Sequence, residues 1–158
     1  MAGIWIVKLP HVYFTYGSNM SSEECRRTAT DAEDLGIGFL PGFRLAFTKH
    51  SITRQGDAAT IAEDATSMVW GFTYRVSEED RKRLGEREGG YEERKCTVYL
   101  PKKPGEKPRA VEAFTFVATS QCPNRCGPPS DYLELILQGA KDRDLPRDYQ
   151  QFLSATRK

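Results

Sequence analysis

The sequence lacks several features that would assign a protein to a functional class at once. It contains no apolar run of the roughly 20 residues that a membrane-spanning helix requires. The N-terminal run Ile4-Trp5-Ile6-Val7 is also too short for the apolar core of a signal peptide and ends at Lys8. We therefore expect a cytoplasmic protein that does not insert into a membrane. Residues 1–10 are expected to form either an edge strand or an N-terminal extension.

An excess of charge of one sign is missing too. The 23 Lys and Arg residues and the 22 Asp and Glu residues nearly cancel, which leaves a formal net charge of +1. Proteins that bind nucleic acid usually carry a clear basic excess, so we do not expect nucleic acid as a partner. The length of 158 residues fits one domain that can build its own hydrophobic core. A single domain over residues 1–158 is therefore expected.

Residues that bind metals or form disulfides are scarce. They are His11, His50, Cys25, Cys96, Cys122 and Cys126. A structural zinc site needs four ligands in short paired spacings, and this set does not provide them. We expect no metal, no cofactor and four reduced cysteines. The sequence leaves open whether Cys122 and Cys126 have a redox role.

The most informative stretch that is present covers residues 12–20. Val, Tyr, Phe, Thr and Tyr in succession favour a strand that is buried on both faces, and Gly17 ends it. Ser21 followed by Glu24 is a capping-box pattern, which predicts a helix from Ser22. Such a turn directs several backbone N–H groups toward one point, which suits a carboxylate or an oxyanion. The glycine patterns of a nucleophile elbow or a nucleotide-binding loop are absent.

Alternation and turn signals predict a series of strands with one helix among them and two helices at the end. Strands are expected at residues 36–40, 43–48, 58–63, 68–76, 91–100 and 111–119, with turns at 41–42 and 64–67. Helices are expected from a cap at Ser77 up to the paired glycines Gly89-Gly90, from a cap at Ser130, and from Pro146 with Tyr149, Phe152 and Leu153 as its packing face. This order predicts an α+β domain with a largely antiparallel, strongly curved sheet or a small β-barrel.

Glu88 departs from the usual pattern of the helix that begins at Ser77. Leu84 must face the core, and Asp80 and Glu88 lie one turn before and after it on the same stripe, whereas Glu86 points elsewhere. Burial and the unsatisfied carbonyl groups of a helix end both disfavour a negative charge there. A glutamate at a position that usually carries Lys or Arg is a candidate functional acid.

Three separate segments together resemble the gamma-glutamylcyclotransferase family. The aromatic strand that ends in Tyr16-Gly17-Ser18-Asn19-Met20 resembles the N-terminal signature of that family. The stretch Leu84-Gly85-Glu86-Arg87-Glu88-Gly89 resembles its second signature. The third segment, similar to the C-terminal part of the family, combines Gly127-Pro128-Pro129-Ser130 and Tyr132 with Gly139-Ala140-Lys141 and Leu145-Pro146. Two residues depart from the family pattern, because Gly85 replaces an acid and Met20 replaces a leucine.

The resemblance implies a fold and a reaction. It implies a mixed β-barrel with flanking helices and an enzyme without a cofactor, which converts a small γ-glutamyl compound into 5-oxoproline and a free amine. In that reaction the α-amine of the substrate attacks its own γ-carbonyl group. Glu88 would be the catalytic general base and acid. The substrate-binding residues would be Tyr13, Phe14, Thr15, Tyr16, Gly17, Ser18, Asn19 and Tyr132.

Several alternatives stay open at this point. The chain could be a non-catalytic protein of the same fold that binds a ligand or partner, or it could run another acyl or amide reaction in the same pocket. The leaving amine would meet the loops expected at residues 49–57 and 121–127. It could belong to an amino acid, a simple amine, glutathione or a modified natural product. The sequence neither requires nor excludes a homodimer.

Overall fold

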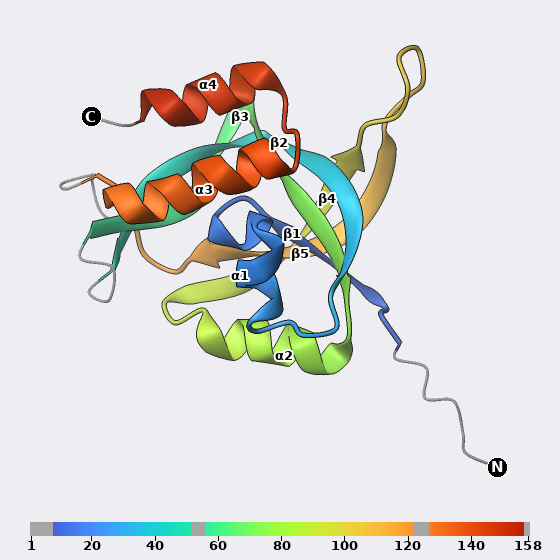
Figure 1. Cartoon of the computed structure of the whole chain (residues 1–158), viewed down its shortest axis with the longest axis horizontal. Helices are drawn as coiled ribbons and strands as arrows, with labels where there is room; N and C mark the ends of the chain where they lie inside the picture. The colour runs from blue at the N-terminus through green and yellow to red at the C-terminus, as the bar shows by residue number, and fades with distance from the viewer. Residues whose placement is uncertain (1–7, 52–55, 122–126, 157–158) are drawn as a thin grey trace.

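The computed structural model describes residues 8–51, 56–121 and 127–156. In chain order the elements are β1 (His11–Thr15), the 3-10 helix η1 (Ser18–Met20), α1 (Ser22–Arg26), β2 (Glu33–Ser51), β3 (Gly56–Val76), α2 (Glu78–Arg87), β4 (Tyr91–Leu100), β5 (Arg109–Ala118), α3 (Ser130–Asp142) and α4 (Arg147–Ala155). The strands close a barrel in the order β1-β3-β2-β4-β5 (Figure 1). β1 and β5 are parallel, and the other neighbours are antiparallel. The predicted mixed, largely antiparallel barrel is confirmed.

β1 is buried along nearly its whole length, as its composition predicts. Val12, Tyr13, Phe14 and Thr15 each expose at most 8% of their surface. The ring of Tyr13 stacks on Phe114 of β5, with ring centroids 5.3 Å apart. Aromatic side chains fit such a site because they bury a large apolar area in a defined geometry. β1 therefore fixes the start of the loop that follows it.

β2 and β3 are longer than the sequence suggests. The two strands expected at 36–40 and 43–48 form one strand, β2, and those expected at 58–63 and 68–76 form β3. The pairing skips from Pro41↔Met68 to Phe43↔Glu63, and Gly42 has a φ of +84°. The expected turns at 41–42 and 64–67 are therefore bulges, because the ladder of hydrogen bonds resumes on both sides of them.

The helix caps follow the sequence signals with two corrections. Ser21 and Ser77 cap α1 and α2, and each side chain accepts a hydrogen bond from a backbone N–H three residues later. Ser130 is not the cap of α3, because the carbonyl group of Pro129 already accepts the first helical hydrogen bond from Leu133. α2 ends at Arg87 and not at Gly89, so Glu88 is its C-cap residue, with φ −85° and ψ 61°.

The helices cover opposite sides of the barrel. α3 and α4 lie together on one side, and α2 lies on the other, with α1 between them (Figure 1). Tyr149 and Leu153 of α4 are buried, but Phe152 is 47% exposed, so its expected packing role is wrong. The position before Leu153 is turned by about 100° around the helix axis and therefore faces solvent. Within the described parts of the chain, no helix has the length and apolar character needed to cross a membrane.

Candidate active site

One cavity of about 750 Å³ brings together every residue that the sequence assigns to the site. The nine predicted residues on its wall are Tyr13, Phe14, Thr15, Tyr16, Gly17, Ser18, Asn19, Glu88 and Tyr132. They come from β1 and the loop after it, from the end of α2 and from the start of α3. Other lining residues include Glu24, Lys49, Ala58, Ala59, Arg87, Tyr91, Thr115 and Asp131. Segments more than 100 residues apart in sequence thus share one pocket.

The loop after β1 forms one wall of the cavity. The carbonyl groups of Gly17 and Ser18 accept hydrogen bonds from the N–H groups of Met20 and Ser21, both at 3.1 Å, which closes the 3-10 turn η1. Among the described residues, no backbone hydrogen bond outside the regular elements uses the N–H of Gly17, Ser18 or Asn19. All three residues line the cavity, so their N–H groups are the candidate donors for a ligand. α1 has only five residues, so its dipole adds little to them.

Tyr132 connects this loop with the opposite wall. Its hydroxyl oxygen would lie 3.7 Å from a Cβ atom on Gly17, and it accepts a hydrogen bond of 3.0 Å from the N–H of Ala59. Tyr91 donates its hydroxyl to the carbonyl oxygen of the same Ala59 at 2.7 Å. Two tyrosines therefore fix one residue of β3 and hold their own hydroxyl groups in place.

Glu88 is held at its backbone and faces the cavity. Its N–H donates to the carbonyl oxygen of Leu84 at 3.1 Å, and its own carbonyl oxygen accepts from the N–H of Tyr91 at 3.0 Å. Asp80, the other acid on the same stripe of α2, is fully buried and accepts hydrogen bonds from the backbone of Asp31 and from Arg83. Asp80 thus stabilises the fold, whereas Glu88 is half-buried and lines the cavity.

Two buried phenols, those of Tyr13 and Tyr16, line the same cavity as Glu88. Burial, and next the carboxylate of Glu88, raise the pKa of Tyr13 above its ordinary value. Burial also raises the pKa of Tyr16. Tyr13 accepts a hydrogen bond of 3.0 Å from the side-chain amide of Asn19, and Tyr16 donates to the carbonyl oxygen of Phe116 at 2.5 Å. Both phenols therefore remain protonated at neutral pH.

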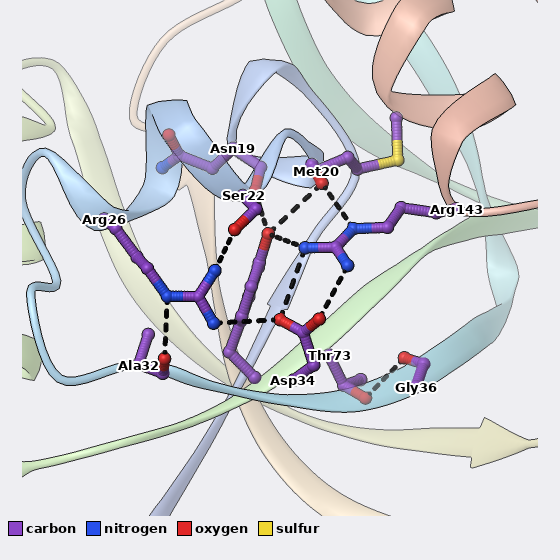
Figure 2. A network of polar contacts seen from close by, with 10 residues as sticks. Asn19, Met20, Ser22, Arg26, Ala32, Asp34, Gly36, Thr73 and Arg143 are labelled. Atoms are coloured by element: carbon purple, nitrogen blue, oxygen red, sulfur yellow. Dashed lines mark hydrogen bonds and ion pairs between the residues drawn. The ribbon is translucent and has the colours of Figure 1, made fainter.

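Figure 2 shows a polar network that holds the far side of the loop. The hydroxyl of Tyr74 lies 2.8 Å from the carbonyl oxygen of Asn19 and 3.1 Å from that of Met20. Arg143, which follows α3, donates to the Met20 carbonyl oxygen and to the Tyr74 hydroxyl, both at 3.0 Å, and to Asp34 at 2.7 Å. The loop is thus fixed to β3 and to the end of α3.

The sequence did not predict this network. Arg26 of α1 completes it by donating to Asp34 at 3.1 Å and to the carbonyl oxygen of Ala32. Asp34 lies 109 residues from Arg143, so no local spacing links the two. The only sequence signal near Arg143 is the third family-like segment, which continues to Leu145-Pro146.

Part of the loop expected at residues 49–57 is paired strand. Lys49 belongs to the end of β2 and pairs with Ala58 of β3. Residues 52–55 and 122–126, with Cys122 and Cys126, lie outside the described residues, as do residues 1–7. In the described parts of the chain, no group of three or more His, Cys, Asp or Glu residues is placed to hold a metal ion.

Comparison with known proteins identifies the family. The sequence profile of the AIG2-like family matches residues 68–153, a range that includes Glu88 and Tyr132. The chain belongs to the AIG2-like family. This AIG2-like chain is similar to proteins named gamma-glutamylcyclotransferase from Mus musculus and Homo sapiens, with 30% and 29% identity over 149 residues. Each alignment covers 91% of this chain and 77% of the relative.

A solved structure gives the same result for the fold. It belongs to a protein named gamma-glutamyl cyclotransferase and superposes on the AIG2-like chain with a TM-score of 0.82 and 26% identity. The match covers 92% of this chain and 86% of the other. The resemblance that the three segments indicate is confirmed. The AIG2-like chain is an enzyme related to gamma-glutamylcyclotransferases.

Proposed function

We propose that this chain is a gamma-glutamylcyclotransferase, which converts a γ-glutamyl amino acid or amine into 5-oxoproline and the free amine. One observation carries the proposal: the loop at residues 13–19, Glu88 and Tyr132 line a single cavity although they are far apart in sequence. The cavity volume of about 750 Å³ lies within the range typical of small-molecule sites. The names of the relatives support the same reaction.

The chemistry asks little of the enzyme beyond shape and proton transfer. The α-amine nitrogen of the substrate attacks its γ-carbonyl carbon, so a new C–N bond closes a five-membered ring and the carbonyl electron pair moves to oxygen. When this intermediate collapses, the original C–N bond breaks and the leaving nitrogen takes up a proton. No water is consumed. Because the reaction is intramolecular, positioning the glutamyl chain supplies a large part of the rate enhancement.

Glu88 acts in this scheme as both base and acid. The α-ammonium group loses two protons on its way to the lactam N–H: the carboxylate of Glu88 relays one from the attacking nitrogen to the leaving nitrogen, and the other ends on the released amine, which leaves as an ammonium ion at neutral pH. A single carboxyl group serves both steps because it ends the cycle in its starting state. The support for this role is the position of Glu88 on the cavity wall, with both of its backbone groups fixed by hydrogen bonds.

The loop and Tyr132 hold the glutamyl half of the substrate. The N–H groups of Gly17, Ser18 and Asn19 donate to the α-carboxylate or to the oxyanion that forms during attack. The hydroxyl of Tyr132 orients the chain from the other side, since it sits next to Gly17. A Cβ atom at Gly17 would be in van der Waals contact with this hydroxyl, so glycine keeps the space beside Tyr132 open.

The test is production of 5-oxoproline from γ-glutamyl-alanine by the purified protein and by Glu88→Gln. The glutamine amide cannot accept the proton, so we expect kcat to fall by at least about 100-fold while the fold and ligand binding persist. Glu86→Gln is the matched control, because Glu86 is exposed on the same helix and does not line the cavity. Circular dichroism and calorimetry with γ-glutamyl-alanine check folding and binding.

Two outcomes would contradict the proposal in different ways. Turnover of Glu88→Gln at the wild-type rate would remove Glu88 from the mechanism. Binding of γ-glutamyl compounds by the wild-type protein without any 5-oxoproline would favour the non-catalytic alternative. A substrate panel with γ-glutamyl amino acids, γ-glutamyl amines and glutathione makes the second outcome decisive.

A further inference from the structure

Lys49 is a cationic side chain on the cavity wall that the proposed mechanism does not use. It is half-buried at the end of β2, and its ammonium group donates to the carbonyl oxygen of His50 at 3.1 Å. The same group lies 5.8 Å from the ring centroid of Tyr91. Among the described residues, no ion pair joins Lys49 to a carboxylate. An ammonium group has three donors, so N–H groups remain for a ligand.

The end of the Lys49 side chain lies against Gly90, two residues after Glu88 in the sequence. A Cβ atom on Gly90 would lie 2.5 Å from the Cε atom of Lys49 and 2.8 Å from its Nζ atom, which is closer than atoms can approach. Gly90 also has a φ of +82°, where a side chain is strained. Its carbonyl oxygen accepts a hydrogen bond of 2.9 Å from Thr119. The end of the lysine side chain therefore rests on a fixed backbone segment two residues after Glu88.

Three residues connect Lys49 to the loop that would hold the glutamyl half. A series of contacts leads from Gly17 to the hydroxyl of Tyr132, from there to Ala59, to Tyr91 and finally to Lys49. A γ-glutamyl compound with its α-carboxylate at Gly17 would place its leaving amine toward the lysine end of this series.

Arg87 is a second cationic side chain on the cavity wall, and its anchor differs from that of Lys49. Arg87 donates to the hydroxyl of Thr28 at 2.6 Å, in the segment that joins α1 to β2. It is therefore anchored on the side of the cavity where η1 and α1 lie. The two cations are thus anchored to different segments of the chain, Arg87 at Thr28 and Lys49 at Tyr91.

We propose that Lys49 is a specificity-determining residue, which favours γ-glutamyl compounds whose leaving amine carries a carboxylate. This inference rests on the proposed function. The contact would be a charge-assisted hydrogen bond, which is stronger than a neutral one. Because Lys49 is only half-buried, we expect a preference of about tenfold in kcat/KM, at the low end for such bonds.

The experiment compares γ-glutamyl-alanine with γ-glutamyl-alaninamide, which differ only in the carboxylate of the leaving group. The ratio of their kcat/KM values is measured for the wild type, Lys49→Met and Lys49→Arg. We expect the ratio to fall about tenfold in Lys49→Met and to be largely retained in Lys49→Arg. Intrinsic differences between the two substrates cancel, because each variant is compared with the wild type on the same pair. The wild-type ratio should also decrease as salt is added.

Lys102→Met is the matched control, because Lys102 is exposed in the loop between β4 and β5, which projects away from the barrel (Figure 1). Its ratio should equal that of the wild type. Formation of 5-oxoproline from both substrates with an unchanged ratio in Lys49→Met would overturn this inference and leave the proposed function intact. Formation of 5-oxoproline from neither substrate by the wild type would overturn the proposed function, and this inference with it.

Discussion

Ala59 illustrates how single hydrogen bonds define the wall of the cavity. The residue is 3% exposed, its N–H donates to the hydroxyl of Tyr132, and its carbonyl oxygen accepts from the hydroxyl of Tyr91. Removing one of these two hydroxyl groups should not cost the same stability as removing the other. A buried N–H without an acceptor is rare in proteins, whereas a carbonyl oxygen that loses one of its partners is better tolerated. The tyrosine that serves the N–H should therefore matter more for stability.

Tyr132→Phe and Tyr91→Phe test this difference. We expect Tyr132→Phe to lower the free energy of unfolding by about 1–3 kcal/mol, because the N–H of Ala59 loses its acceptor, and Tyr91→Phe to cost less. If Tyr132 also orients the substrate, Tyr132→Phe should raise KM for γ-glutamyl-alanine about fivefold. Urea unfolding and steady-state kinetics measure the two effects. A wild-type KM together with reduced stability would limit Tyr132 to a structural role.

Single residues differ in how far the sequence can predict their position. The inward direction of Glu88 follows from its spacing to Leu84, because residues four apart lie on one face of a helix. The same spacing predicts an inward Asp80, but only the structure shows that its carboxylate is bound by Asp31 and Arg83. Lys49 shows no such local pattern, since its neighbours Tyr91 and Gly90 come from another part of the chain.

At the scale of elements, the loop after β1 depends on groups behind it. The loop closes its own turn η1, and its carbonyl groups at Asn19 and Met20 are bound from outside by Tyr74 and Arg143 (Figure 2). The guanidinium of Arg143 also lies 3.9 Å from the ring centroid of Phe72. A planar group with several donors in fixed directions suits this combination, and a lysine ammonium does not.

Arg143→Lys tests whether the network positions the loop. We expect the free energy of unfolding to fall by about 1–3 kcal/mol, because the side chain is only 14% exposed and its bonds to three groups are broken. Since Arg143 does not line the cavity, KM should rise while kcat stays close to the wild-type value. Arg27→Lys is the control, because Arg27 is 56% exposed and its surface ion pairs contribute little. An unchanged KM would mean that the network stabilises the fold alone.

Asp34 gives the same network a pH dependence. Burial opposes ionisation of this carboxyl, but the guanidinium groups of Arg143 and Arg26 outweigh it and lower the pKa of Asp34. The stabilisation is therefore complete above the unfolded value of about 3.9 and is lost as the pH falls through the folded value. Between about pH 5 and about pH 3, the wild type should lose more unfolding free energy than Asp34→Asn. Equal losses in urea unfolding would contradict this account.

Elements also differ in how well local sequence predicts them. The caps at Ser21 and Ser77 were predictable because a capping side chain needs only a partner three residues away. The predicted turns at 41–42 and 64–67 were wrong because pairing with a distant strand outweighed the local preference. Their residues favour turns locally, but the pairing of β2 with β3 continues on both sides, so the chain forms bulges there.

At the scale of the whole molecule, the closed barrel depends on a pair of glycines. Gly38 of β2 and Gly71 of β3 lie directly opposite each other. A Cβ atom on Gly71 would lie 2.2 Å from the carbonyl oxygen of Thr15, and one on Gly38 would lie 2.6 Å from a methyl group of Val98. Glycine in a strand often marks a place where backbones approach closely. Here the missing side chains allow β1 and β4 to approach the two long strands and close the barrel.

Gly71→Ala and Gly85→Ala should therefore change stability in opposite directions. The methyl group at residue 71 would meet the backbone of β1, so we expect Gly71→Ala to lower Tm by about 5 °C or more. Gly85 lies within α2, and in the described parts of the chain no neighbouring atom comes within 4 Å of the place that a methyl group would occupy. Alanine there should stabilise the helix by about 0.5–1 kcal/mol. Thermal unfolding of both variants beside the wild type measures the difference.

Gly71 lies next to β1, the strand that ends in the site, so the loss of stability in Gly71→Ala should be accompanied by a loss of activity. A Gly71→Ala protein with the Tm of the wild type would show instead that the barrel relaxes around the methyl group.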